Sequence, residues 1–333
     1  MSGSQGRLKE FEALRGLSIV LLLALHSNIF DPRVFGEALS DLGMFVASFL
    51  LGSFFFLAGY FTEVSLAKPN RNAWGFIWSK FIRIFPPYWF ALFLFIFVMG
   101  YSLNRTAVAV YAMNLQAIFA PTFIKSVLTL WYISMLVVFY IFYGSVMLAT
   151  RSSVWLIAIS FGVFFFALWL HLTKGFFDPR FFQYYFTFLA GVLLCRFETI
   201  REKLFGLHAF FKILLAIVSI LVFQWVLNEA YPATHGAFIV SSVFFMLSLI
   251  LMWLSIFRSG LGDWNIWTWL STASFFTYLV HRPLWYVIDD IWGLEPSLPT
   301  VLIHLIPGAI VALILGYLLQ LGYDRLLAAL RLK

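Results

Sequence analysis

Apolar residues fill long stretches of the chain, and short polar segments that hold most of the charged side chains separate these stretches. A helix that crosses a bilayer needs about 20 predominantly apolar residues. The pattern therefore predicts an all-α, polytopic membrane protein of about ten transmembrane helices. The segment 107–121 is ambiguous and allows an eleventh span or a re-entrant helix. The predicted spans are 10–30, 40–64, 84–101, 126–149, 152–171, 181–196, 210–228, 237–257, 267–289 and 300–323.

The Lys and Arg residues test these spans independently, because cytoplasmic loops of membrane proteins carry the excess of positive charge. With the N-terminus inside the cell, the cytoplasmic segments hold fifteen of the 22 Lys and Arg residues, and the opposite segments hold five. Arg15 and Arg282 lie within predicted helices. This bias predicts that both termini are cytoplasmic. It also explains the formal net charge of +7 by topology, so we expect no nucleic-acid partner.

Composition and motifs narrow the class further. The chain is 62% hydrophobic and 11% charged, with a mean hydropathy of +0.93, far from the composition of a soluble domain. The single Cys195 excludes an intramolecular disulfide. HExxH, GxGxxG and P-loop motifs are missing, and we expect no metal. We predict one membrane domain over 1–333 without an appended soluble domain, and a first apolar segment that is retained rather than cleaved as a signal peptide.

Glu12, Arg15 and His26 bring ionisable groups into the first apolar segment. Eleven α-helical steps take the chain from Arg15 to His26, which brings the two side chains to within roughly 20° of one direction, about 16 Å apart along the axis. Glu12 lies three residues before Arg15, within reach of an ion pair. Ionisable groups at membrane depth are costly and usually face a protein interior or a water-filled cavity. We interpret this polar face as the active site.

Six segments, taken in their order along the chain, have a common resemblance. The most specific is an Arg and a His with ten residues between them, here Arg15 and His26 within EALRGLSIVLLLALHS. The others are FFFLAGYF at 54–61, KFIRIFPPYW at 80–89, LWYISMLVVFY at 130–140, FFQYYFTFLAGVLL at 181–194 and SFFTYLVHRPLW at 274–285. Together they resemble the acyltransferase 3 family of integral membrane acyltransferases, and the resemblance covers nearly the whole chain.

The resemblance implies an O-acyltransferase that takes an acyl group, expected to be acetyl from cytoplasmic acetyl-CoA, and places it on a hydroxyl of an envelope glycan or glycolipid. It also implies a location in a bacterial inner membrane, with acyl-CoA, the acceptor and the lipid bilayer as partners. Two positions depart from the family's pattern. Many members have Asp where Glu12 stands, a change that keeps the charge. Many have Arg-x-x-Arg where this chain has Lys80 and Arg83, and Lys binds phosphate as a point charge.

Acyl transfer to a hydroxyl needs a base, stabilisation of an oxyanion and a grip on the donor. His26 is the predicted catalytic residue, either as general base or as carrier of the acyl group, and the sequence leaves both routes open. The resemblance implies that Arg15 binds the donor or holds the catalytic geometry. The alternative for Arg15 is a helix-end charge paired with Glu12. We expect Glu12 to orient Arg15 rather than to act on the substrate.

A second histidine, His281, is predicted to lie at a depth similar to that of His26. Helical rise places His281 about 21 Å along its own helix, against roughly 24 Å for His26. Tyr278 and Trp285 flank His281 on one helical face. This face is suited to binding an acceptor hydroxyl or to stabilising the transition state. A structural polar contact between helices explains it equally well.

Cations gather in the segment 68–83, which we predict to be a loop immediately before the helix that starts near Pro86. We expect Lys80 and Arg83, with Arg71, to bind phosphates of CoA, assisted by the N-terminal amides of that helix. The excess of positive charge in cytoplasmic loops explains these cations equally well.

Trp131, Tyr132 and Ser134 lie toward the outer half of the fourth predicted helix and are candidates to line the path of the acceptor. Aromatic residues make up 20% of the chain, so core packing also accounts for the first two. Gly52 and Gly59 predict close packing of the second helix.

Two kinds of alternative remain open. The first alternative is still an acyltransferase, but one that transfers another acyl group, such as succinyl, or uses a lipid or another small molecule as the acceptor. From a different class, the protein is a transporter of a glycolipid or solute that does no chemistry. Transporters more often show duplicated halves and paired broken helices, and we find neither pattern in this sequence.

Overall fold

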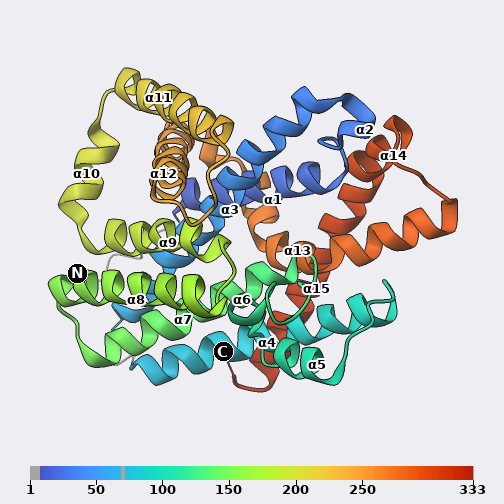
Figure 1. Ribbon diagram of the computed structural model, residues 1–333, viewed down its shortest axis with the longest axis horizontal. Coiled ribbons are helices and arrows are strands. Elements are labelled where there is room, and N and C mark those ends of the chain that lie inside the picture. Colours follow the sequence, from blue (N-terminus) through green and yellow to red (C-terminus); the bar gives the residue numbers. More distant parts are fainter. Residues whose placement is uncertain (1–7, 69–71, 333) are drawn as a thin grey trace. The chain divides into compact units, whose positions relative to one another are not determined.

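The computed structural model describes residues 8–68 and 72–332, and every regular element in these two ranges is helical (Figure 1). The prediction of an all-α protein is confirmed. The elements are α1 (Lys9–His26), α2 (Pro32–Phe35), α3 (Glu37–Leu66), α4 (Ala73–Phe97), α5 (Arg105–Ala112), α6 (Gln116–Phe119), α7 (Leu130–Ala149), α8 (Ser153–Lys174), α9 (Arg180–Arg196), α10 (Glu198–Gly206), α11 (Ala209–Asn228), α12 (Gly236–Arg258), η1 (Leu261–Asp263), α13 (Asn265–Trp292), α14 (Leu298–Ile303), η2 (His304–Gly308) and α15 (Ala309–Ala329).

The chain forms two compact units. The first unit contains residues 8–57, 202–220 and 245–332, and the second contains the described residues from 58 to 201 and from 221 to 244. Both α1 and α13 belong to the first unit, whereas α4 and α7 belong to the second. The predicted site residues are therefore divided between the two units.

In the first unit, α13 packs against both α1 and α15. Two glycines permit this close packing. A Cβ on Gly16 of α1 would lie 2.9 Å from a ring carbon of Trp267, and a Cβ on Gly316 of α15 would lie 2.9 Å from the Cα of Thr277. These approaches leave no room for a side chain on either glycine, so they fix the register of α1 and α15 along α13.

In the second unit, α7 contacts α4, α8 and α9. Aromatic rings fill the space between α7 and α9, where Phe139 contacts Phe181, Tyr185 and Phe188 at ring-centre distances of 5.2 to 5.8 Å. A Cβ on Gly59 of α3 would collide with the carbonyl group of Phe188. The prediction that Gly59 permits close helix packing is thus confirmed.

Gly52, the other glycine of this pattern, lies in the part of α3 that belongs to the first unit. A Cβ at this position would overlap the side chain of Met246 in α12. Both glycines of α3 therefore allow another helix to approach, each within its own unit.

Seven helical segments are long and apolar enough to cross a membrane in the described part of the chain. They are Asp41–Leu66, Ala73–Phe97, Leu130–Met147, Ser153–Lys174, Ala209–Asn228, Gly236–Arg258 and Leu298–Ala329. The other three predicted spans also form helices, as α1, α9 and α13, but they do not reach the same apolar length. Charged residues interrupt α1, α9 has 17 residues, and α13 contains His281 and Arg282. The count of about ten spans and the sidedness of the termini stay predictions.

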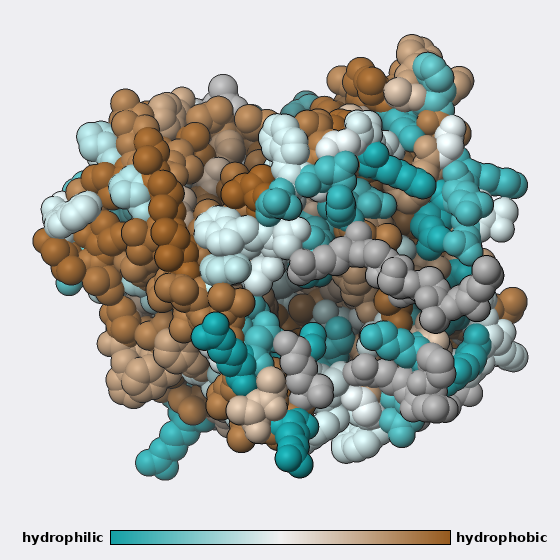
Figure 2. Space-filling view, turned by 180° about the vertical axis from the view of Figure 1, so that it is seen from behind, coloured by the Kyte–Doolittle hydropathy of each residue, from teal (hydrophilic) through white to brown (hydrophobic). Residues whose placement is uncertain are grey.

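Several helices expose large apolar side chains. On α8, for example, Val154 is 75% exposed, Trp155 62% and Leu172 69%. Figure 2 shows broad apolar areas on the face that it displays. Contact of such apolar surfaces with water is unfavourable, whereas the hydrocarbon of a bilayer accommodates them. The surface therefore agrees with an integral membrane protein.

The start of α4 differs from the prediction. The helix begins at Ala73, where the side chain of Asn72 accepts a hydrogen bond from the backbone N–H of Gly75 at 2.6 Å, and Pro86 and Pro87 lie in its interior. Prolines interrupt only two backbone hydrogen bonds, and membrane helices tolerate this loss. The prediction of a loop over 68–83 was wrong for residues 73–83, because α4 occupies them.

The ambiguous segment 107–121 contains most of α5 and all of α6, two short helices rather than one long helix. A side-chain network holds this connection. Ser134 of α7 donates to the carbonyl of Asn114 at 2.7 Å and accepts from the N–H of Ala117 at 2.9 Å. Neither α5, with eight residues, nor α6, with four, is long enough to cross a bilayer.

Candidate active site

The first functional side chain stands at the end of α1. Leu14, Ile19, Leu22 and Leu23 are buried along this helix, and their packing holds α1 in place. His26 is the last helical residue, where the backbone N–H of Ser27 still bonds to the carbonyl of Ala24 at 3.2 Å. The imidazole is half-buried at a helix end whose position is fixed by the apolar packing below it.

The second functional side chain comes from the middle of α13. His281 is fully buried, with an exposed fraction of 0%. Its Nε2 lies 2.8 Å from Nδ1 of His26, and the two ring planes differ by 2°. The ring centres are 5.0 Å apart. Because most of this separation is taken up by the short N···N distance and the two ring radii, the rings lie edge to edge rather than face to face. The prediction that both imidazoles lie at similar depth is confirmed.

The partners of His281 determine where the protons of this pair reside. Nδ1 of His281 lies 3.1 Å from the carbonyl oxygen of Thr277 and 2.9 Å from that of Tyr278. Carbonyl oxygens only accept hydrogen bonds, so Nδ1 of His281 must carry a proton. In a neutral ring, Nε2 of His281 is then the acceptor, and Nδ1–H of His26 donates to it.

This chain of donors leaves one nitrogen of the pair basic. When Nδ1 of neutral His26 carries its proton, Nε2 of His26 has the free lone pair. Nε2 of His26 makes no hydrogen bond to another described residue. The geometry therefore presents one imidazole nitrogen as a base or nucleophile, and the other three nitrogens of the pair hold it in that state.

Aromatic rings enclose His281 on α13. The ring centre of Tyr278 lies 6.2 Å from that of His281, and the ring centre of Trp285 lies 5.6 Å from it at an angle of 86°. Tyr278 is 5% exposed and Trp285 is 3% exposed. The predicted flanking positions of both residues are confirmed, and together they exclude water from one side of the histidine pair.

Glu12 and Arg15 lie nearer the start of α1. The carboxylate of Glu12 accepts a hydrogen bond from Oγ1 of Thr268 in α13 at 2.6 Å, which ties the two helices together well away from His26. Lys9 adds an exposed ion pair with Asp263 at 2.8 Å. Arg15 is half-buried on the same helix. These residues align the start of α1 with the start of α13, while the histidine pair joins the end of α1 to the middle of α13.

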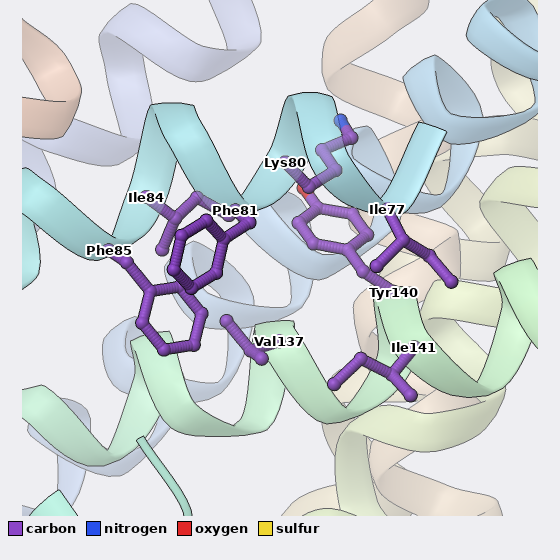
Figure 3. A pocket seen from close by; sticks show the side chains of 8 residues that line it. All are labelled: Ile77, Lys80, Phe81, Ile84, Phe85, Val137, Tyr140 and Ile141. Carbon is purple, nitrogen blue, oxygen red and sulfur yellow. The ribbon is translucent and has the colours of Figure 1, made fainter. Parts of the chain in front are cut away.

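Lys80 belongs to the second unit, where it lines a pocket between α4 and α7 (Figure 3). Its Nζ lies 4.4 Å from the ring centre of Tyr140 and 5.2 Å from that of Phe76, distances at which a cation is attracted to an aromatic face. The remaining lining is apolar or aromatic: Ile77, Phe81, Ile84, Phe85, Val137, Tyr140 and Ile141. The pocket thus combines one ammonium group with an apolar groove.

The other predicted cations differ in their surroundings. Arg83 is exposed, one turn after Lys80 on α4, so both charges lie on neighbouring positions of one helix. Arg71 lies outside the described residues.

The three candidates on α7 also belong to the second unit. The guanidinium of Arg180 stacks on Trp131, 3.7 Å from the ring centre, and an ion pair with Asp178 at 2.5 Å holds that guanidinium. Tyr132 is 7% exposed. Ser134 uses its hydroxyl to hold the α5–α6 connection, as described above. Structural contacts therefore account for Trp131 and Ser134.

The structure reveals two polar clusters that the sequence analysis did not identify. In the second unit, Glu63 of α3 forms an ion pair with Arg196 of α9, and Tyr143 of α7 donates to the same carboxylate. In the first unit, Asp289 lies 2.8 Å from His304. Each cluster had a signal in the sequence, because an ionisable residue inside or at the edge of an apolar stretch is costly unless it has a partner. The sequence did not show which partners would meet.

No group of three or more His, Cys, Asp or Glu side chains that could hold a metal ion is found among the described residues. The site contains two imidazoles, which are suited to proton transfer, and aromatic side chains that surround one of them.

These features define a class of protein: an all-helical membrane protein in which the helices α1 and α13 bring a histidine pair together. A family model described as an acyltransferase domain matches residues 8–321. The chain therefore belongs to the acyltransferase 3 family and is a membrane acyltransferase. No curated protein and no solved structure matches the chain.

Proposed function

We propose that the protein transfers an acetyl group from cytoplasmic acetyl-CoA to a hydroxyl of an envelope glycan or glycolipid, with His26 as the catalytic residue. The observation that carries this proposal is the hydrogen bond of 2.8 Å between His26 and His281, which leaves Nε2 of His26 as the basic atom. Membership of the family supports the reaction class.

In the direct route, Nε2 of His26 takes the proton of the acceptor hydroxyl as its oxygen attacks the thioester carbonyl. The tetrahedral intermediate then collapses, the C–S bond breaks, and the thiolate of CoA takes the proton back from Nε2. In the alternative route, Nε2 attacks the thioester carbonyl itself, the C–S bond breaks and the thiolate of CoA leaves. The acceptor hydroxyl then attacks the acetyl group on Nε2, the bond between Nε2 and the acetyl carbon breaks, and the hydroxyl proton passes to the thiolate. Both routes use the same nitrogen and release CoA thiol and the acetyl ester.

His281 is a positioning residue in either route. Its acceptor nitrogen fixes the tautomer of His26, and the carbonyls of Thr277 and Tyr278 fix the tautomer of His281 in turn. When His26 gains a proton at Nε2, its Nδ1–H still donates to His281. The pair therefore needs no rearrangement during proton transfer, which is the condition for efficient acid–base catalysis.

The donor is expected to contact cations. The ammonium of Lys80 beside an apolar groove suits an anionic group attached to a less polar chain, as in the phosphates and pantetheine arm of CoA. Arg83, one turn further, supplies a second charge. Arg15, on the same helix as His26, is proposed to hold the part of the donor that lies nearer to its thioester carbonyl. The proposed location is the inner membrane of a bacterium.

Release of free CoA thiol from acetyl-CoA tests the proposal. Wild-type protein in lipid nanodiscs is compared with His26→Ala and with His235→Ala, which alters an exposed histidine stacked on Tyr231. We expect release by wild type and His235→Ala but not by His26→Ala. Equal release by all three proteins would remove His26 from the mechanism, and no release by any of them would contradict acetyl-CoA as the donor.

A further inference from the structure

A third histidine is buried near the pair formed by His26 and His281. His304, at the start of the π-helical turn η2, is 2% exposed, and its Nε2 lies 2.8 Å from Oδ1 of Asp289 near the end of α13. Trp285 stacks on it, with ring centres 4.7 Å apart and planes that differ by 4°. Trp285 also contacts His281, and the two rings are nearly perpendicular. Trp285 therefore lies between the catalytic pair and His304.

Two polar atoms of this cluster are buried without a hydrogen-bond partner in the part of the chain that the structure describes: Nε1 of Trp285 and Nδ1 of His304. Burial of a polar group without a partner is unfavourable, and native structures contain few such groups. Two of them on stacked rings indicate a place where another molecule supplies the partners.

The chemistry of the two atoms specifies that partner. Asp289 as a carboxylate accepts a hydrogen bond from Nε2–H of His304, so Nδ1 of the neutral ring is an acceptor. Nε1–H of Trp285 is a donor only. One atom needs a donor and the other needs an acceptor. A hydroxyl group is both at once, whereas an ammonium only donates and a carboxylate or phosphate oxygen only accepts.

The backbone at Gly308 passes close to these two buried atoms. A Cβ on Gly308 would lie 2.9 Å from Nε1 of Trp285 and 3.0 Å from the carbonyl oxygen of Ile303. Gly308 has helical dihedral angles, with φ −65° and ψ −41°, so its backbone does not require glycine. The lack of a side chain instead allows the backbone of η2 to approach the buried indole N–H closely. The turn that presents Gly308 and His304 is π-helical, and π-helical turns are frequent at functional sites.

We propose that Trp285 and His304, with Asp289 as the residue that fixes the tautomer, bind a second hydroxyl of the acceptor. This inference rests on the proposed function, because the contact of Trp285 with His281 places the bound hydroxyl next to the catalytic pair. It narrows the acceptor to a polyhydroxylated compound, since one hydroxyl reacts at His26 while another is held at His304. A molecule with a single hydroxyl leaves both buried atoms without partners.

The test compares acceptors that share a tail and differ in hydroxyl number. Hexyl β-D-glucoside, galactoside and mannoside are offered against 1-hexanol, with acetyl-CoA as donor and protein in nanodiscs. The variants are His304→Phe and Trp285→Phe, which keep aromatic rings and remove one polar atom each. Matched controls are His235→Phe, an exposed histidine stacked on Tyr231, and Trp292→Phe, an exposed tryptophan at the end of α13.

Wild type and both controls are expected to prefer at least one glycoside over hexanol in kcat/KM, because sites that bind a substrate hydroxyl reject analogues that lack it. The ratio of kcat/KM for that glycoside over hexanol is expected to fall about tenfold or more in His304→Phe and in Trp285→Phe. An unchanged ratio, with both rates lowered by one factor, would overturn the proposal and assign the two atoms to a structural water. No preference in wild type would overturn it as well.

A binding readout separates this inference from the proposed function. The same glycosides are expected to raise the thermal unfolding midpoint of wild type more than hexanol does, and His304→Phe is expected to remove that difference. If no acetyl transfer occurs but this stabilisation is seen, the proposed function fails and the hydroxyl site stands. If transfer occurs but no such stabilisation is seen, the site fails alone.

Discussion

Each unit of the molecule contains a cluster of polar side chains in apolar surroundings, and the two clusters are built differently. In the second unit, Glu63 and Arg196 are joined by bonds of 2.9 and 3.1 Å, and Tyr143 donates to the same carboxylate. In the first unit, His26 and His281 form a chain of neutral groups that ends at Nε2 of His26, an atom without a hydrogen-bond partner among the described residues. The first arrangement neutralises two charges within the protein. The second leaves a reactive nitrogen available.

The comparison teaches how buried polarity can serve either stability or chemistry. Opposite charges that pair with each other hold α3, α7 and α9 together. Neutral imidazoles can be bonded to one another without charge and still exchange a proton. We expect activity to depend on the His26–His281 pair and folding to depend on the Glu63–Arg196 pair.

Replacement of the base should have the largest effect. His26→Ala is expected to lower the rate of acyl transfer by about 10³-fold or more, because a positioned base contributes about 10²- to 10⁴-fold and no other described group takes its place. CoA thiol release measures the rate, and the thermal unfolding midpoint should remain close to that of wild type. A variant that loses activity only because it unfolds would contradict the assigned role.

Loss of the acid in the second unit should affect folding instead. Glu63→Ala leaves Arg196, whose side chain is 12% exposed, without its carboxylate, and we expect a loss of about 3 to 5 kcal/mol in the free energy of unfolding. Denaturant titration measures this loss. Glu198→Ala is the matched control, because Glu198 is 70% exposed in its ion pair with Arg201, and an exposed pair contributes about 1 kcal/mol or less. Equal losses in both variants would show that the buried pair has no special importance.

The positioning residue should have an intermediate effect. His281→Ala removes the acceptor for Nδ1–H of His26, so we expect a decrease in kcat of about 10²-fold through lost tautomer and orientation. His281→Gln retains an acceptor oxygen and should recover part of the activity. The ratio of the two variants distinguishes positioning from packing, since a packing role would follow side-chain volume and not the presence of an acceptor.

Donor binding should show the smallest effect. Lys80→Met removes the ammonium while keeping a long apolar side chain, and we expect KM for acetyl-CoA to rise about tenfold, with a smaller change in kcat. Lys68→Met is the control, because Lys68 is an exposed cation before α4. The same KM in both variants would support the alternative that these cations only set the topology.

Much of the helical framework followed from local sequence. Apolar length predicted where α3, α7, α8, α11 and α12 would form, because each of these segments must satisfy its backbone hydrogen bonds internally in a membrane. The start of α4 was placed too late, because Pro86 and Pro87 suggested a helix start. The cap at Asn72, fourteen residues earlier than Pro86, had a weaker pattern in the sequence.

The sequence by itself determined which side chains needed partners. An Arg, a Glu and several His residues in apolar stretches needed polar or charged partners. Helical rise alone predicted that His26 and His281 lie at a similar depth. Only the tertiary structure decided which atoms meet. The pairs His26–His281, Asp289–His304 and Glu63–Arg196 each depend on how separate helices are rotated against one another. Hydrogen bonds are sensitive to distance and angle within fractions of an ångström, and hydrophobic patterns do not specify rotation at that precision.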